Sequence, residues 1–297
     1  MSKFISFLIV ASFLGLWIKS FFNETTQTYV GFILIFSFGI LHGANDLLLI
    51  GRTQSIEKVI YTTKILLYYC IVVILGAALF YFIPAIALAL FILVSGYHFG
   101  QQHWQLDSKK GSNWFEFLFQ LSYGLLILAL LFVCHQEDVQ RIMLDITGFI
   151  ISSKLITTFF YLSVICTLST GFIIFRNAKQ VKRALEIELL LLMVLAVLFQ
   201  TSTLIWGFAL YFIIWHSIPS IKDQIDFLYG SFTWQNFKQY FKSAAVYWLV
   251  SLIGIALLYS LFNKQHYFDA LFFAFLAAIT FPHVWVIVQI FKTKSQR

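Results

Sequence analysis

The chain has 297 residues, of which 60% are hydrophobic and 11% are charged. A soluble domain is roughly 45–50% apolar and about 25% charged, so this composition excludes a soluble globular protein and favours one that lies in a lipid bilayer. The net charge of +7 is explained by basic loops that face anionic lipid, and it gives no support for nucleic-acid binding.

Ten apolar runs follow one another along the chain. Because a membrane-spanning helix needs about 20 residues, we expect an all-α, polytopic membrane helix bundle of about ten transmembrane helices in a single domain, residues 1–297. The expected helices are 4–18, 29–50, 64–82, 85–104, 115–134, 155–175, 184–200, 204–221, 243–263 and 268–291. The polar stretch near 222–242 is expected to be a loop with an interfacial helix.

Basic residues at the ends of these runs indicate the orientation. With the N-terminus in the cytoplasm, 16 of the 20 Lys and Arg residues fall on the cytoplasmic side and four fall outside. This distribution follows the positive-inside rule, so we expect both termini to be cytoplasmic.

Four histidines lie within apolar runs, where an imidazole is costly unless it is hydrogen-bonded or binds a ligand. They are His42, His98, His216 and His283. All four fall on expected helices that run in the same direction, at depths of roughly 8–12 Å from the cytoplasmic ends at about 1.5 Å per residue. We therefore expect them to lie in one layer and to bind one metal ion. The alternative is four separate packing histidines, each hydrogen-bonded to a neighbouring helix.

Two of these histidines are flanked by glycines at GxxxG spacing. His42 lies within Gly39–Gly43 and His98 lies within Gly96–Gly100. Small residues at this spacing let two helix backbones approach closely, which short imidazole side chains need if they are to meet at one ion.

Carboxylates occur at the same expected depth. Asp46 follows His42 by one helical turn, and Glu188 lies one turn inside the run that begins at 184. A carboxylate that accepts the second ring N–H of a ligating histidine fixes its orientation, and we predict this role for both residues. For Asp46, direct ligation and an interfacial charge remain alternatives. Glu186 is expected at the headgroup level.

Three segments resemble the hallmark stretches of the Brp/Blh family of bacterial and archaeal membrane β-carotene 15,15'-dioxygenases. They are Gly39–Asp46, Tyr97–Gly100 and Tyr211–Ser217. The resemblance implies a multi-pass protein of the inner (plasma) membrane with an Fe(2+) centre bound by histidines. It implies that dioxygen cleaves β-carotene at the central double bond to give two all-trans-retinal molecules. A retinal-binding rhodopsin is the natural consumer of such a product.

The resemblance also implies residue roles. Three histidines match the family's ligand positions and are predicted to be catalytic: His42, His98 and His216. The family usually has a further histidine four residues after the one in Trp-His-Ser, and this chain has Ser220 there. Either His283 completes the ligand set, or Asp46 or water does, with Ser220 beside the ligands. Ser220 also raises the chance of an altered activity.

Aromatic residues flank the histidines and are predicted to line a polyene-binding pocket. They are Tyr97, Phe99 and Trp215. Flat rings pack well along a conjugated chain, and the chain is 19% aromatic.

Two other functions fit the same residues. Paired histidines on neighbouring helices could hold a haem in a membrane electron carrier. A carotenoid- or retinal-binding or transport protein without catalysis would also be apolar and aromatic. The ligand type does not choose the metal, because neutral imidazoles suit iron(II), zinc, copper and nickel.

Overall fold

The computed structural model describes residues 3–53, 59–105, 114–175, 182–261 and 265–295, and the regular elements in these ranges are helices. Most are α-helices, and two short segments, η1 and η2, are π-helices. In chain order they are α1 (Lys3–Lys19), α2 (Glu24–Leu34), η1 (Ile35–Gly39), α3 (Asp46–Thr53), α4 (Val59–Phe82), α5 (Pro84–His103), α6 (Trp114–Cys134), α7 (Gln136–Thr147), α8 (Ser153–Phe175), α9 (Lys182–Thr201), α10 (Leu204–Leu210), η2 (Tyr211–Ser217), α11 (Ile218–Tyr229), α12 (Trp234–Leu261) and α13 (Gln265–Ser295).

Seven stretches of the described residues are long and apolar enough to cross a membrane. They are Thr63–Phe82, Pro84–His103, Trp114–Cys134, Ser153–Phe175, Leu204–Tyr229, Trp234–Leu257 and Leu271–Phe291. The expected all-α, membrane-type architecture agrees with this finding. The expected runs 4–18 and 184–200 are helical as α1 and α9, and they fall outside these seven spans.

The prediction of one continuous helix over 29–50 is wrong. The chain leaves the helix in a turn at 42–45 and starts a new helix, α3, at Asp46. Gly43 and Asn45 stand in this turn, and residues of these types favour turns over helix interiors because of backbone freedom and local hydrogen bonding. Asp46 therefore begins a new helix instead of following His42 on one continuous face.

The connection expected near 222–242 is also shorter than predicted. Helix α11 continues to Tyr229, and α12 already begins at Trp234. Gly230 ends α11 with a φ of 86°, a left-handed conformation that only glycine adopts at little cost.

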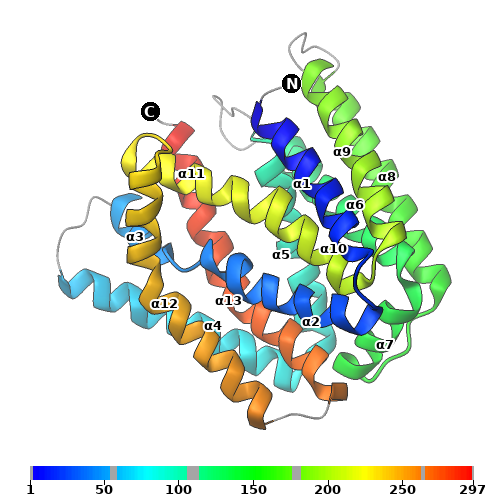
Figure 1. Ribbon diagram of the computed structural model, residues 1–297, viewed down its shortest axis with the longest axis horizontal. Coiled ribbons are helices and arrows are strands. Elements are labelled where there is room, and N and C mark those ends of the chain that lie inside the picture. The colour runs from blue at the N-terminus through cyan, green and yellow to red at the C-terminus, as the bar shows by residue number, and fades with distance from the viewer. Residues whose placement is uncertain (1–2, 54–58, 106–113, 176–181, 262–264, 296–297) are drawn as a thin grey trace. The chain divides into compact units, whose positions relative to one another are not determined.

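The chain packs as two compact units, which we describe separately. The first comprises Met1–Ile35, Gly96–Arg141 and Ile150–Ile218, and the second comprises Phe36–Ser95, Ile142–Phe149 and Pro219–Arg297. In the first unit α6 packs against α8 and α9, α10 packs against α2, and α1 contacts α9 and η2 (Figure 1). In the second unit α13 packs against α3, α4 and α12 (Figure 1).

The GxxxG pair around His98 does bring two helices together. A Cβ atom on Gly100 would overlap the backbone carbonyl of Gln120, and a Cβ on Gly124 would overlap that of Gly96. Helices α5 and α6 are thus in backbone contact just beside His98, as the glycine spacing predicts.

This contact leads to a stability prediction. Gly124→Ala should destabilise the protein by about 1–3 kcal/mol, because the new methyl group forces the two backbones apart. Thermal unfolding in detergent, followed by circular dichroism, measures the effect. The matched control is Gly254→Ala in α12, where an added Cβ meets nothing within 4 Å. Equal unfolding midpoints for the two variants would contradict the close helix contact.

One hydrophobic cluster in the core of the second unit consists of aliphatic and aromatic side chains from α3, α11 and α13. Its buried members are Leu49, Ile50, Phe227, Val286, Ile287 and Ile290. Burying these side chains removes apolar surface from solvent and fixes α3, which follows the turn with His42, against α13, which carries His283.

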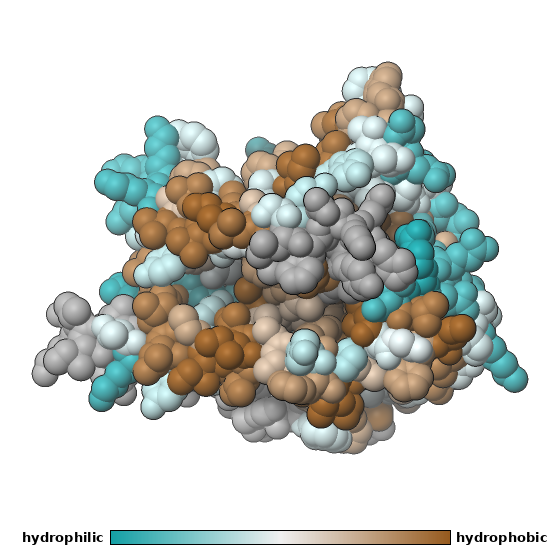
Figure 2. All heavy atoms as spheres, turned by 90° about the horizontal axis from the view of Figure 1, so that it is seen from below, coloured by the Kyte–Doolittle hydropathy of each residue, from teal (hydrophilic) through white to brown (hydrophobic). Residues whose placement is uncertain are grey.

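Large hydrophobic side chains are also exposed on the outside of several helices. On α8 these are Tyr161, Leu162, Ile165, Leu168 and Phe172. Figure 2 shows one face of the molecule, on which hydrophobic residues are widespread. Apolar surface on this scale is unusual for a soluble monomer and is what a lipid-facing surface requires.

Candidate metal centre

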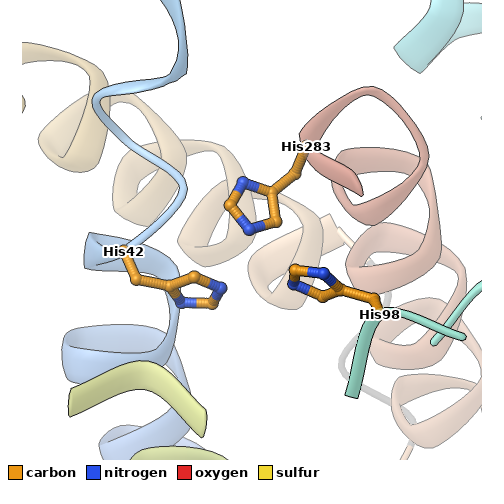
Figure 3. Close-up of side chains that lie close together, drawn as sticks. All are labelled: His42, His98 and His283. Carbon is orange, nitrogen blue, oxygen red and sulfur yellow. The ribbon is translucent and has the colours of Figure 1, made fainter. Parts of the chain in front are cut away.

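Two of the predicted histidines form a close pair in the second unit. His42 lies in the turn after η1, and His283 follows Pro282 in α13. Their ring centroids are 4.7 Å apart with the rings edge to face, and both side chains are buried (Figure 3). A Cβ at Gly43 would lie 3.5 Å from the Nδ1 atom of His283, an ordinary van der Waals distance, so the backbone of the turn packs directly against the His283 ring. Figure 3 also labels His98, which belongs to the first unit.

The surroundings of His283 fix the proton on its ring. Its Nδ1 atom lies 2.8 Å from Oδ1 of Asp46, and because an ionised carboxylate can only accept, Nδ1 is the N–H donor. The hydroxyl of Tyr69 donates to the other carboxylate oxygen at 2.9 Å. With its proton on Nδ1, His283 has its lone pair on Nε2, the arrangement found in many metal-ligating histidines.

The position of the proton on the His42 ring is fixed in the same way. Its Nδ1 atom is hydrogen-bonded to the backbone carbonyl of Gly39, and a carbonyl oxygen also only accepts. The backbone carbonyl of His42 accepts hydrogen bonds from Nε2 of Gln224 at 2.9 Å and from the hydroxyl of Tyr240 at 3.3 Å. These bonds satisfy a carbonyl that the broken helix would otherwise leave without a partner in an apolar environment.

The side chain of Ser220 helps to hold Gln224, which donates to the backbone carbonyl of His42. It is buried and accepts a hydrogen bond from Nε2 of Gln224 at 3.1 Å. The turn itself is held by Asn45, whose amide donates to the carbonyl of Tyr240 at 2.9 Å. Ser220 is therefore linked through Gln224 to the backbone carbonyl of His42.

Sequence reasoning did not find the supporting residues Tyr69, Gln224 and Tyr240. The available signal was the presence of polar side chains in otherwise apolar helices. That signal does not tell which distant backbone group or carboxylate each one will meet.

The other two predicted histidines form a similar pair in the first unit. The rings of His98 and His216 are 4.6 Å apart at their centroids and meet edge to face, and both are buried. His216 lies within the π-helix η2, a type of segment that is rare and frequent at functional sites. Phe212 stacks on the His216 ring at 5.4 Å, and Phe99 contacts the same ring at 4.8 Å.

The three predicted pocket residues have different neighbours. Phe99 lies against His216. Tyr97 is partly buried, with its ring 5.0 Å from Phe117. The indole N–H of Trp215 donates to the hydroxyl of Ser12 at 2.8 Å, which ties η2 to α1.

The two carboxylates predicted to support the histidines have different neighbours. Asp46 is hydrogen-bonded to His283. Glu188 lies beside His103, with a 3.4 Å separation between Oε2 and Nδ1, and it accepts a hydrogen bond from Tyr123.

The buried histidines are chemically suited to a metal. Each of His42, His98 and His283 offers one ring nitrogen, and neutral imidazole nitrogens are good ligands for iron(II) and other first-row ions. The proton positions on His42 and His283 agree with this role.

Comparison with known proteins agrees with the resemblance noted in the sequence. The family model described as beta-carotene 15,15'-dioxygenase matches residues 33–291, a range that contains all four buried histidines. No curated protein and no solved structure matches the chain. From the extent of the family match, together with the histidines it covers, the chain belongs to the β-carotene 15,15'-dioxygenase family.

Proposed function

We propose that this protein cleaves β-carotene at the central 15,15' double bond with dioxygen, giving two molecules of all-trans-retinal. The observation that carries the proposal is the pairing of buried imidazoles, His42 with His283 and His98 with His216, in a chain of this family. The sequence expectation of one histidine layer and the family's single iron centre support one shared ion for both pairs.

The residue chemistry fits an iron(II) ion bound by histidines. In both His42 and His283 the proton lies on Nδ1, so the lone pair lies on Nε2. Bound iron(II) would supply the activation of dioxygen. His283 occupies, in this proposal, the ligand role that the family usually gives to the position of Ser220.

Aromatic side chains would position the polyene. Phe99 and Phe212 both pack against His216 and present apolar rings beside the histidine pair. We propose that Tyr97 and Trp215 complete this lining from the same helices. Such a surface excludes water and favours a flat conjugated hydrocarbon over a polar ligand.

The reaction needs no general acid and no general base. Both oxygen atoms of dioxygen end in the two aldehydes, so no proton and no external reductant is consumed. The protein therefore has to hold the ion, orient the central double bond and keep water away, and these are the tasks that the buried histidines and aromatic rings can perform.

The test is expression in carotene-accumulating bacteria. The wild-type chain should bleach the orange colour while retinal appears, and a His98→Ala variant made to similar membrane levels should stay orange. Retained colour with well-expressed wild-type protein would contradict the proposal and favour a carotenoid-binding or transport role. A Soret band in the purified protein would instead favour a haem carrier.

A further inference from the structure

A second buried group of polar side chains lies in the first unit, and the proposed reaction does not use it. We call it the polar cluster, and its members are His103, Trp104, Tyr123, Glu188 and Tyr211. Glu188 is its centre: His103 Nδ1 lies 3.4 Å from Oε2, and the Tyr123 hydroxyl donates to the same oxygen at 2.5 Å. The ring of Tyr211 lies parallel to that of His103, with centroids 6.2 Å apart.

Three polar atoms of the polar cluster point to a ligand. The Nε2 atom of His103, the Nε1 atom of Trp104 and the hydroxyl of Tyr211 are buried and have no hydrogen-bond partner among the described residues. Buried polar groups in native proteins almost always have a partner, which can be a water molecule or a ligand. Neither the histidine side chain, only 6% exposed, nor the fully buried tyrosine can obtain one from bulk solvent.

The donor and acceptor pattern indicates what that partner is. Nδ1 of His103 lies 3.4 Å from the carboxylate of Glu188, and the negative oxygen favours the tautomer with its proton on Nδ1. In that neutral ring the Nε2 atom is an acceptor. Trp104 offers a donor, and the hydroxyl of Tyr211 offers another. A ligand oxygen can accept a hydrogen bond from either donor and, if it carries a proton, can also donate one to Nε2.

The walls around the polar cluster are aromatic. Trp104 packs against Phe119 at 5.1 Å, and Tyr211 packs against Phe99 at 5.3 Å and Phe199 at 6.3 Å. A ligand for this place therefore combines an apolar, flat body with one oxygen.

The polar cluster adjoins the His98–His216 pair. Helix α5 carries both His98 and His103, five residues or about 7.5 Å apart along the axis, and Phe99 contacts both Tyr211 and His216. β-Carotene is a hydrocarbon and cannot satisfy these polar atoms. Its cleavage products each carry a carbonyl oxygen, and hydroxylated isoprenoids carry a hydroxyl.

We propose that the polar cluster binds the oxygen of an isoprenoid end group, either a carbonyl or a hydroxyl. The inference rests on the proposed function for the isoprenoid nature of the ligand. Its consequence is a preference for product over substrate: an aldehyde gains hydrogen bonds on moving along α5 from the histidine pair, whereas the hydrocarbon gains none.

The test compares three ligands with one carbon skeleton: retinal, retinol and the hydrocarbon that ends in a methyl group. Full-length protein in lipid nanodiscs is titrated with each, and binding is measured by quenching of tryptophan fluorescence. Tyr211→Phe should weaken binding of the oxygen-bearing ligand about 5- to 10-fold, the loss expected for one hydrogen bond, and leave the hydrocarbon unchanged. The matched control is Tyr161→Phe, at an exposed tyrosine of α8.

The outcomes separate the alternatives. A loss for retinal alone identifies a carbonyl site, and a loss for retinol alone identifies a hydroxyl site. Unchanged binding of all three ligands, in Tyr211→Phe and also in Trp104→Phe, would mean that the polar cluster holds water only. An equal loss for all three would mean that Tyr211 only packs. Either result overturns the inference, and because the assay measures binding without cleavage, its failure differs from failure of the colour test.

Discussion

His283→Ala is expected to remove iron from the protein and to abolish retinal formation. The side chain is buried against His42 and is hydrogen-bonded to Asp46, so its loss removes an imidazole that lies directly beside His42. The loss of activity should exceed the roughly 10- to 100-fold effect of removing a residue that only supports a ligand. Retinal is measured by chromatography of membrane extracts, and iron by mass spectrometry of the purified protein.

Two further variants show whether His283 has replaced the usual family ligand. His135→Ala, at a histidine between α6 and α7, is the control and should keep both iron and activity. Ser220→His restores the family pattern, and in the His283→Ala background it should not restore activity. Ser220 is buried and hydrogen-bonded to Gln224, which holds the backbone carbonyl of His42, so a larger side chain there disturbs the support of His42. Full activity of His283→Ala would show that Asp46 or water completes the ligand set.

Asp46→Asn is expected to lower iron affinity by about 10- to 100-fold. The carboxylate accepts one hydrogen bond from His283 and another from Tyr69, and an amide has only one oxygen to accept both. The ring of His283 therefore loses its fixed orientation or its Nδ1–H tautomer. Titration of the metal-free protein with iron(II), followed by its absorption spectrum, measures the affinity.

The control for this variant is another Asp→Asn change in the same unit. Asp226 forms a partly exposed ion pair with Lys222, and such pairs contribute little to stability. Asp226→Asn should therefore leave iron binding unchanged. If Asp46→Asn bound iron as tightly as the wild type, Asp46 would not orient His283.

Much of the architecture follows from sequence patterns alone. Long apolar runs predict membrane-type helices because about 20 consecutive apolar residues match the thickness of the bilayer, and the described residues contain seven helices long and apolar enough to span it. The glycines around His98 predict close helix packing, and the contact of Gly100 with Gln120 confirms it. These features depend on residues that are near one another in the chain.

The features that sequence reasoning missed depend on distant residues. The break after His42 is stabilised by Gln224 and Tyr240, which lie about 180 to 200 residues later in the chain. The hydrogen bond between Tyr69 and Asp46 likewise joins two helices whose packing no local pattern encodes. Glu188 was predicted to support a ligand from its depth, but depth alone does not reveal that His103 and Tyr123 are its neighbours.

The most direct test of the central claim is the number of iron ions bound per chain. If both histidine pairs ligate one ion, the purified protein should bind one iron per chain, and His42→Ala or His98→Ala should each remove it completely. X-ray absorption should then show imidazole nitrogen as the dominant ligand. Two independently bound ions, each lost only when its own pair is changed, or iron binding that survives both substitutions, would contradict the account.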